Sequence, residues 1–104
     1  MDETDIFRAL ADPTRRAVFE QLVRAEKTVG GLSAELPVSQ PAVSQHLSVL
    51  KQAGLVVERR EGRFNYYRTA PGALAPLADW VERYRSFWPE RVEKLKEILK
   101  EMEP

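Results

Sequence analysis

The chain has 104 residues, which is enough for one domain with a modest core but too few for two independent domains. Sixteen Lys and Arg balance sixteen Asp and Glu, so the net charge favours no class of partner, and the absence of Cys excludes disulfides and thiolate metal sites. No apolar run approaches the roughly 20 residues that span a membrane, and the N-terminus is acidic, unlike a signal peptide. We therefore expect a cytoplasmic protein with no membrane partner.

Two helices are predicted at the start of the chain. The first lies within residues 1–12 and ends at Asp12, a natural N-cap for a second helix that begins with Pro13. Apolar residues recur along one side of the second helix, which predicts a buried face. These residues are Val18, Phe19, Leu22 and Val23.

The next two helices are predicted to form a helix-turn-helix pair over residues 29–53. A short helix is expected from Val29 to Glu35, followed by a tight connection. Ser39 then caps a longer helix from Gln40 to Ala53, and Gly54 stops it.

A hairpin and a long helix complete the predicted fold. Residues 55–69 contain two runs of β-forming residues on either side of a turn signal, which predicts a two-stranded wing. From residue 73 to 102 the apolar spacing is helical again, with a kink or short break expected near Ser86–Pro89 because of Pro89. The prediction is one winged helix-turn-helix domain over residues 1–104: mainly α-helical with a small β-hairpin, in the order α-α-α-α-β-β-α.

The outer face of the 40–53 helix indicates nucleic-acid binding. Val43, Leu47 and Leu50 fall on one side of the helix, whereas the other side carries small or amide residues. Such a slim polar face suits the DNA major groove, which is about 12 Å wide, and Gln can pair bidentately with adenine. The alternative is an ordinary solvated face, which would usually be rich in Glu and Lys, and residues 39–50 contain neither. The outer residues are Gln40, Pro41, Ser44, Gln45, Ser48 and Gln52, with Lys51 beside them.

Arginines near the tip of the predicted wing, Arg59, Arg60 and Arg63, are suited to neutralising phosphates. Taken alone, a solvated charged turn is an equally good interpretation, but a neighbouring reading helix favours phosphate contact. His46 is the single histidine, and it lies at the edge of the buried stripe. One histidine cannot build a metal site, and none adjoins a nucleophile, so we expect no metal site, no cofactor and no enzymatic activity.

An aromatic and aliphatic stripe runs along the predicted last helix. About 28 residues at 1.5 Å each extend roughly 42 Å, more than a globule with a radius of gyration of about 13 Å can cover. We therefore expect a second copy of the chain to cover the stripe. A two-fold dimer would place two reading helices about 34 Å apart, which matches an inverted-repeat DNA site. A small-molecule pocket under Trp80 and Trp88 is an open alternative. The predicted interface residues on this helix are Leu77, Trp80, Val81, Tyr84, Trp88 and Leu95.

Several segments of the chain resemble the ArsR/SmtB family of bacterial regulators. They are residues 7–16 (FRALADPTRR), 39–47 (SQPAVSQHL) and 50–56 (LKQAGLV), with EGR at 61–63 followed by YYR at 66–68. The resemblance implies a homodimeric transcriptional repressor whose dimer contacts come from the first and last helices. This implication adds Ile6 and Phe7 to the predicted interface.

The same resemblance assigns roles to residues of the 40–53 helix and argues against metal sensing. It places Gln40, Ser44 and Gln45 against the bases, and Ser39, His46 and the wing arginines nearer the DNA backbone. Metal-sensing members of the family carry Cys pairs in the helix before the turn or Asp and His ligands in the last helix. This chain has no Cys in the former, and in the latter it has Val where a His is needed. We therefore expect the cysteine-free branch without metal ligands.

The predicted function is that of a sequence-specific DNA-binding regulator. It would act as a homodimeric repressor on double-stranded DNA with an inverted repeat, with an unidentified small-molecule inducer as a possible further partner. The rival class is a winged-helix protein-interaction module, which would need an acidic wing or a bulky apolar outer helix face, and neither is present. The predicted DNA-binding residues are Ser39, Gln40, Pro41, Ser44, Gln45, His46, Ser48, Lys51, Arg60 and Arg63.

Overall fold

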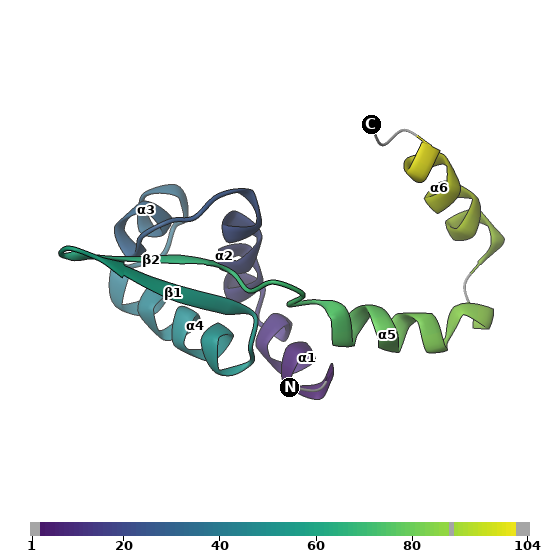
Figure 1. The fold of residues 1–104 in the computed structure, drawn as a ribbon, viewed down its shortest axis with the longest axis horizontal. Helices are drawn as coiled ribbons and strands as arrows, with labels where there is room; N and C mark the ends of the chain where they lie inside the picture. The colour runs from purple at the N-terminus through teal and green to yellow at the C-terminus, as the bar shows by residue number, and fades with distance from the viewer. Residues whose placement is uncertain (1–2, 88, 102–104) are drawn as a thin grey trace.

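The computed structural model describes residues 3–87 and 89–101, and for residues 91, 92, 95 and 96 it describes the backbone but not the side chains. The order of elements is that of the predicted winged helix-turn-helix, except that the last predicted helix is divided (Figure 1). The elements are α1 (Glu3–Ala11), α2 (Pro13–Arg24), α3 (Val29–Glu35), α4 (Gln40–Gln52), β1 (Val56–Glu61), β2 (Phe64–Thr69), α5 (Ala75–Arg83), a 3-10 turn η1 (Arg85–Phe87) and α6 (Glu90–Glu101).

Two predicted side-chain caps are confirmed at the starts of α2 and α4. Asp12 Oδ1 accepts a hydrogen bond from the Arg15 backbone N–H at 3.0 Å, and Pro13 is the first residue of α2. Ser39 Oγ accepts from the Ala42 backbone N–H at 3.3 Å. Each cap satisfies an amide that the first turn of a helix leaves without an intrahelical partner. These local rules fix where the second and the fourth helix begin.

The hydrophobic core lies between helices α1–α4 and the start of the hairpin. The predicted inward face of α4 is confirmed, because Val43, Leu47 and Leu50 are at most 1% exposed. Val23, predicted to be on the buried side of α2, is instead 61% exposed. It lies at the edge of that side and borders an open hollow near the start of α5. The buried core residues are Ile6, Ala9, Val18, Phe19, Leu22, Leu32, Val43, Leu47, Leu50, Ala53, Leu55 and Val56.

The hairpin is closed by a tight turn and fastened to the helices at its outer edge. Glu61 pairs with Phe64, and Gly62 has a φ of +60°, which suits the first position of a two-residue type II′ turn. On the other side of β2, the Tyr67 and Lys27 backbones exchange two hydrogen bonds, of 2.8 and 3.0 Å. The connection between α2 and α3 is thereby paired to the wing, so the wing has a fixed position against the helices.

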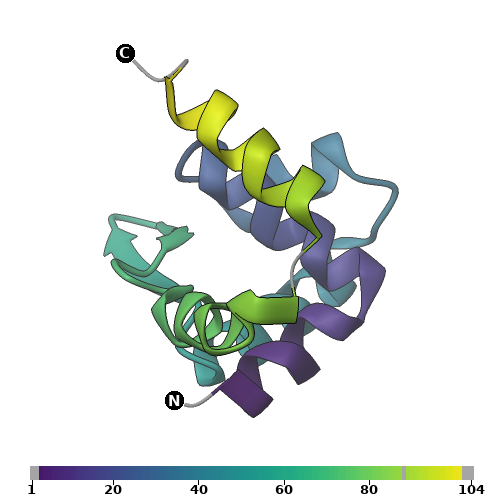
Figure 2. The same cartoon turned by 90° about the vertical axis from the view of Figure 1, so that its right-hand side faces the viewer.

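The molecule has a compact part and a projecting part. We call residues 3–69 the body and the described residues from Ala75 onward the arm. In Figure 1, α5 leaves the body beside α1 and α6 turns back from its far end; Figure 2 shows the same arrangement looking along α5. The radius of gyration is 15.8 Å, compared with about 13 Å for a compact domain of this length. A single chain therefore leaves the arm largely uncovered.

The break predicted near Ser86–Pro89 is present and begins slightly earlier in the chain. α5 already ends at Arg83, and the Phe87 N–H donates to the Tyr84 carbonyl at 2.9 Å in a 3-10 turn before α6 begins at Glu90. Pro89 lacks an N–H, and its ring clashes with the carbonyl four residues earlier, so an α-helix cannot continue through it. The tighter i→i+3 bonds end the helix before this clash arises.

Candidate nucleic-acid interface

The outer face of α4 is exposed and polar, as predicted from its sequence. Ser39, Gln40, Ser44, Gln45 and Ser48 are all exposed, and so is Pro41 in the first turn. The opposite face is held in the core, so the polar face projects from the body on a rigid support. A short connection, residues 36–39, joins α4 to α3. This pair of helices has the form of a helix-turn-helix with α4 as its second helix.

His46 lies at the boundary between the two faces of α4 and is half-buried. The pKa of Asp12 is lowered, chiefly by the Arg15 backbone N–H and to a lesser extent by the charge of His46. Within the described residues, no group of three His, Cys, Asp or Glu side chains is arranged to hold a metal ion.

The two faces of strand β1 carry different groups because successive side chains alternate across a strand. Val56 is buried in the core, so Glu58 and Arg60 share the face turned towards α4. Arg59 and Glu61 lie on the opposite face. The wing thus presents one charged face beside α4 and another towards the connection between α2 and α3.

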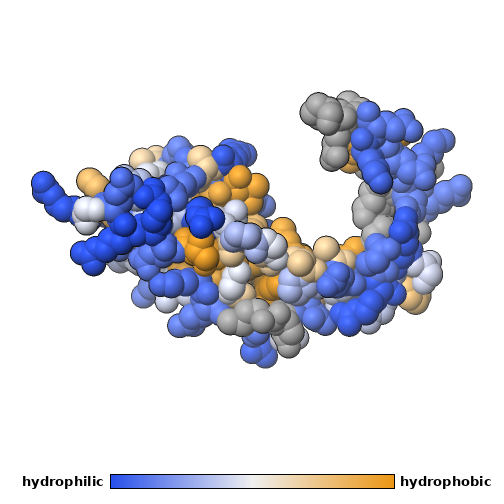
Figure 3. All heavy atoms as spheres, viewed as in Figure 1, coloured by the Kyte–Doolittle hydropathy of each residue, from blue (hydrophilic) through white to orange (hydrophobic). Residues whose placement is uncertain are grey.

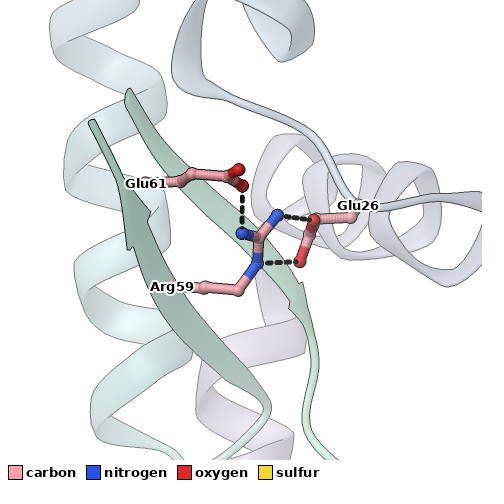
Figure 4. A network of polar contacts seen from close by, with 3 residues as sticks. All are labelled: Glu26, Arg59 and Glu61. Atoms are coloured by element: carbon pink, nitrogen blue, oxygen red, sulfur yellow. Dashed lines mark hydrogen bonds and ion pairs between the residues drawn. The ribbon is translucent and has the colours of Figure 1, made fainter. Parts of the chain in front are cut away.

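Arg59 is a structural residue of the wing rather than a free cation (Figure 4). Its Nη2 lies 2.6 Å from Glu26 Oε1 and its Nε lies 3.3 Å from Glu26 Oε2, while Nη1 pairs with Glu61. The guanidinium also lies over the Tyr66 ring, 4.8 Å from its centroid. The hydrogen bonds from Arg59 lower the pKa of Glu26. In turn, the bonds to Glu26 and Glu61 raise the pKa of Arg59. The sequence did not indicate this network because Glu26 precedes Arg59 by 33 residues.

Arg60 and Arg63, the two predicted wing contacts, differ from Arg59. Both are exposed, and neither forms an ion pair with any residue of the described chain. Arg63 lies in the turn and Arg60 on the face nearer α4. Their charges are therefore available to an anionic partner beside the polar face of α4.

Lys51, also predicted to contact DNA, is already paired. Its Nζ lies 2.7 Å from Glu58 Oε1, and Glu58 Oε2 accepts a hydrogen bond of 2.9 Å from the Tyr67 hydroxyl. The three side chains, together with Ser44 and Ser48 of α4, line a hollow of about 200 Å³ between the reading helix and the wing. Glu58 and Tyr67 were not predicted from the sequence, because their relation to Lys51 depends on how the hairpin packs.

The predicted dimer residues are partly within the body and partly on the arm. Ile6 is only 1% exposed inside the chain's own core, so it has no surface to offer to a partner, and that prediction is corrected. Phe7 is 41% exposed and packs edge-to-face on Trp80, with ring centroids 5.1 Å apart. Trp80 in turn lies 5.0 Å from the Tyr84 ring. Leu77 packs against the core, and Val81 is half-buried on α5.

Two further predictions for the arm remain predictions. Trp88 lies outside the described residues, and of Leu95 only the backbone, within α6, is described. The proposed ligand pocket under Trp80 and Trp88 has the same status. A shallow apolar hollow of about 370 Å³ does occur at the root of α5, but its lining, which includes Phe19 and Leu74, does not include Trp80.

These features define a class of protein. A tight helix pair, a second helix with an exposed polar face and a hairpin that exposes Arg60 and Arg63 make a winged helix-turn-helix, a fold that reads DNA with its second helix.

Comparison with known proteins identifies the family. Residues 12–57 match the family of bacterial regulatory proteins named arsR. The chain is 49% identical over 78 residues to the HTH-type transcriptional regulator Rv2034 of Mycobacterium tuberculosis, covering 75% of this chain and 73% of that protein. It is 34% identical over 77 residues to the transcriptional repressor SdpR of Bacillus subtilis, covering 74% and 86% of the two chains. A solved ArsR-like transcriptional regulator from Rhodococcus sp. RHA1 is 35% identical, covers 96% of this chain and 92% of its own, and superposes with a TM-score of 0.75.

The chain therefore belongs to the ArsR family and is a DNA-binding transcriptional regulator, not an enzyme. The resemblance predicted from the sequence is confirmed, and so is the winged helix-turn-helix fold. No helix in the described part of the chain combines the length and the apolar character that crossing a membrane requires.

Proposed function

We propose that this regulator is a repressor that binds an inverted-repeat DNA site as a homodimer in the cytoplasm. The observation that carries the proposal is the separation of the two faces of α4: Val43 and Leu47 are buried, while Gln40, Ser44 and Gln45 are exposed on the other side. Such a helix can enter a major groove without displacing its own packing. The name of the SdpR relative, a transcriptional repressor, supports the direction of regulation.

Roles divide along this proposed interface. Gln40, Ser44 and Gln45 would read base edges, because amide and hydroxyl groups both donate and accept hydrogen bonds. Ser39, Pro41, His46 and Ser48 would lie nearer the sugar-phosphate backbone, and the helix N-terminus favours a phosphate. Arg60 and Arg63 would neutralise phosphates from the wing.

The exposed apolar surface of the arm supports the homodimer. Hydrophobic residues gather on the concave side between the body and α5 (Figure 3). Tyr84 is 44% exposed and Phe87 79% exposed, and both continue the ring series that starts at Phe7 and Trp80. We propose that a second copy covers Phe7, Trp80, Val81 and Tyr84, with Leu77, Trp88 and Leu95 as further candidates. Two copies related by a two-fold axis would require a symmetric DNA site.

The test is DNA selection followed by binding measurements. Selecting duplexes from a random pool with the purified protein should return an inverted repeat, and binding should weaken as salt rises. Gln45→Ala should relax the preference at one base position in each half-site, with a loss on the order of 1–3 kcal/mol at that position. Gln21→Ala, the same change on α2, is the matched control.

Two results would contradict the proposal. Recovery of sequences without symmetry would exclude the two-fold arrangement. Equal weakening by Gln45→Ala on every duplex would show that Gln45 contacts only the backbone, and the reading role of α4 would then be wrong.

A further inference from the structure

Glu58 occupies an unusual place for an acid, because it lies on the face of the wing turned towards the reading helix. Its carboxylate is held at both oxygens, by Lys51 Nζ at 2.7 Å and by the Tyr67 hydroxyl at 2.9 Å. Ser44 and Ser48, from the polar face of α4, border the same hollow. An anion is thus built into the surface that carries the predicted DNA contacts.

The position of Glu58 is fixed from two sides. Tyr67 is directly opposite Glu58 in the strand register. The Tyr67 backbone is itself paired with Lys27, so the hydroxyl that holds the carboxylate belongs to an anchored residue. The Glu58 side chain is 27% exposed, compared with 54% for Lys51. Glu58 is therefore the fixed member of the pair, and Lys51 is the member that solvent or a ligand can reach.

The pair changes the charge that DNA would meet. The bonds from Lys51 and Tyr67 lower the pKa of Glu58, so it is an anion at neutral pH. While Lys51 is bound to this anion, the two charges cancel and release no counterion from DNA. If Lys51 moved to a phosphate, the Glu58 carboxylate would lose its ion-pair partner while facing the same polyanion.

We propose that Glu58 withholds Lys51 from the DNA backbone and so limits the affinity of this regulator and the salt dependence of its binding. The inference rests on the proposed docking of α4 and the wing on DNA. Under this proposal the predicted DNA contact of Lys51 forms only when Glu58 loses its charge. Phosphate contacts near the hollow then come from Arg60 and Arg63.

The experiment is a salt titration of binding to a fluorescent duplex selected by the wild-type protein, using full-length variants. Glu58→Gln should steepen the slope of log K against log salt by about 0.9, the value for one added phosphate contact. For equal affinities at 1 M salt, the same relation makes the variant bind about eightfold more tightly than the wild type at 0.1 M salt. The double variant Glu58→Gln with Lys51→Met should return to the wild-type slope, because the released cation is gone.

Glu61→Gln is the matched control, because it removes an acid from the opposite face of the same strand, where Glu61 pairs with Arg59. The proposal expects this change to leave the slope near the wild-type value. It is overturned if Glu61→Gln steepens the slope as much as Glu58→Gln does, which would show a general effect of net charge. It is also overturned if Glu58→Gln has no effect while Lys51→Met makes the slope shallower, because Lys51 would then already bind phosphate.

Two more variants separate this inference from the proposed function. If Gln45→Ala and Arg63→Ala leave binding unchanged, α4 and the wing do not face DNA, and both proposals fail. If those two variants weaken binding and Glu58→Gln changes nothing, the interface is correct and only the role of Glu58 is wrong.

Discussion

The body and the arm both have amphipathic sequences, but they differ in how their apolar faces are covered. Among the described residues, the buried hydrophobic core lies between Ile6 and Val56, and no residue of α5 or η1 is buried. Leu47 in the body is 1% exposed and Phe87 in the arm is 79% exposed. An amphipathic pattern predicts that a helix face will be covered. The difference shows that the pattern does not say whether the residues that bury a helix face come from the same chain.

The largest expected effect is on the core of the body. Leu47→Ala should lower the free energy of unfolding by about 2–5 kcal/mol, because a fully buried leucine leaves both a cavity and lost apolar burial. Thermal unfolding followed by circular dichroism measures the change. Val49→Ala on the same helix, 37% exposed, is the control and should cost clearly less. Equal losses for the two variants would contradict the assignment of the buried face.

On the arm, the corresponding change should act on association rather than on folding. Tyr84→Ala removes a 44% exposed ring and should weaken the proposed dimer by about 2 kcal/mol, roughly 30-fold in the dissociation constant. Sedimentation equilibrium measures this, and Asp79→Ala on the same helix is the control. If Tyr84→Ala unfolds the body or leaves self-association unchanged, the arm is not the surface that a second copy covers.

A smaller effect is expected at the start of the reading helix. Ser39→Ala removes the hydroxyl that accepts from Ala42 and should cost about 1 kcal/mol of stability. Ser48→Ala makes the same change on the exposed face within the helix, where Ala favours the helical state, so it should cost little or nothing. Denaturant unfolding of the two variants compares them directly. If Ser48→Ala lowers the free energy of unfolding as much as Ser39→Ala does, the loss at Ser39 does not come from the cap.

The smallest effect on folding stability is expected from lowering the pH. The pKa values of Glu26 and Glu58 in the wing and of Glu3, which pairs with Arg83 between α1 and α5, are all lowered from an ordinary value of 4.5. The unfolded state therefore binds more protons below pH 4.5. The contribution of these carboxylates to stability is fully present above that pH and is lost as the pH falls through their folded-state pKa values. The loss should be modest because these pairs are largely exposed.

Urea unfolding between pH 7 and pH 3 measures this dependence. Glu26→Gln should flatten the profile, because glutamine does not titrate and the contribution of the Arg59 pair is already absent. A wild-type profile that stays flat down to pH 3 would show that these ion pairs contribute nothing to folding.

Local features of the fold were predictable from the sequence to within a residue or two. The caps at Asp12 and Ser39 and the bounds of α3 depend on neighbours three or four positions away, so the sequence contains the needed information. The inward face of α4 follows from the period of 3.6 residues. The early end of α5 was less predictable, because Pro89 shows that a helix must stop but not how far ahead the turn tightens.

The charged part of the site was less predictable, for a physical reason. Three arginines near the wing tip look alike in the sequence, but a strand alternates its faces and each face meets a different neighbour. Arg59 meets Glu26, 33 positions away, and is neutralised. Arg60 lies on the other face. Lys51 and Glu58 are seven residues apart, but only the packing of the hairpin on α4 brings their charges together.

The pairing of Lys27 with Tyr67 also affects the tendency of the protein to aggregate at high concentration. A two-stranded sheet has two open edges, and an open edge can recruit a strand from another molecule. Here the outer edge of β2 is occupied at Tyr67 by the Lys27 backbone, and β1 carries four consecutive charged residues, Glu58 to Glu61. Such charges discourage strand addition. Both features protect the sheet against edge-to-edge aggregation, and they leave the helical arm as the surface for the proposed dimer.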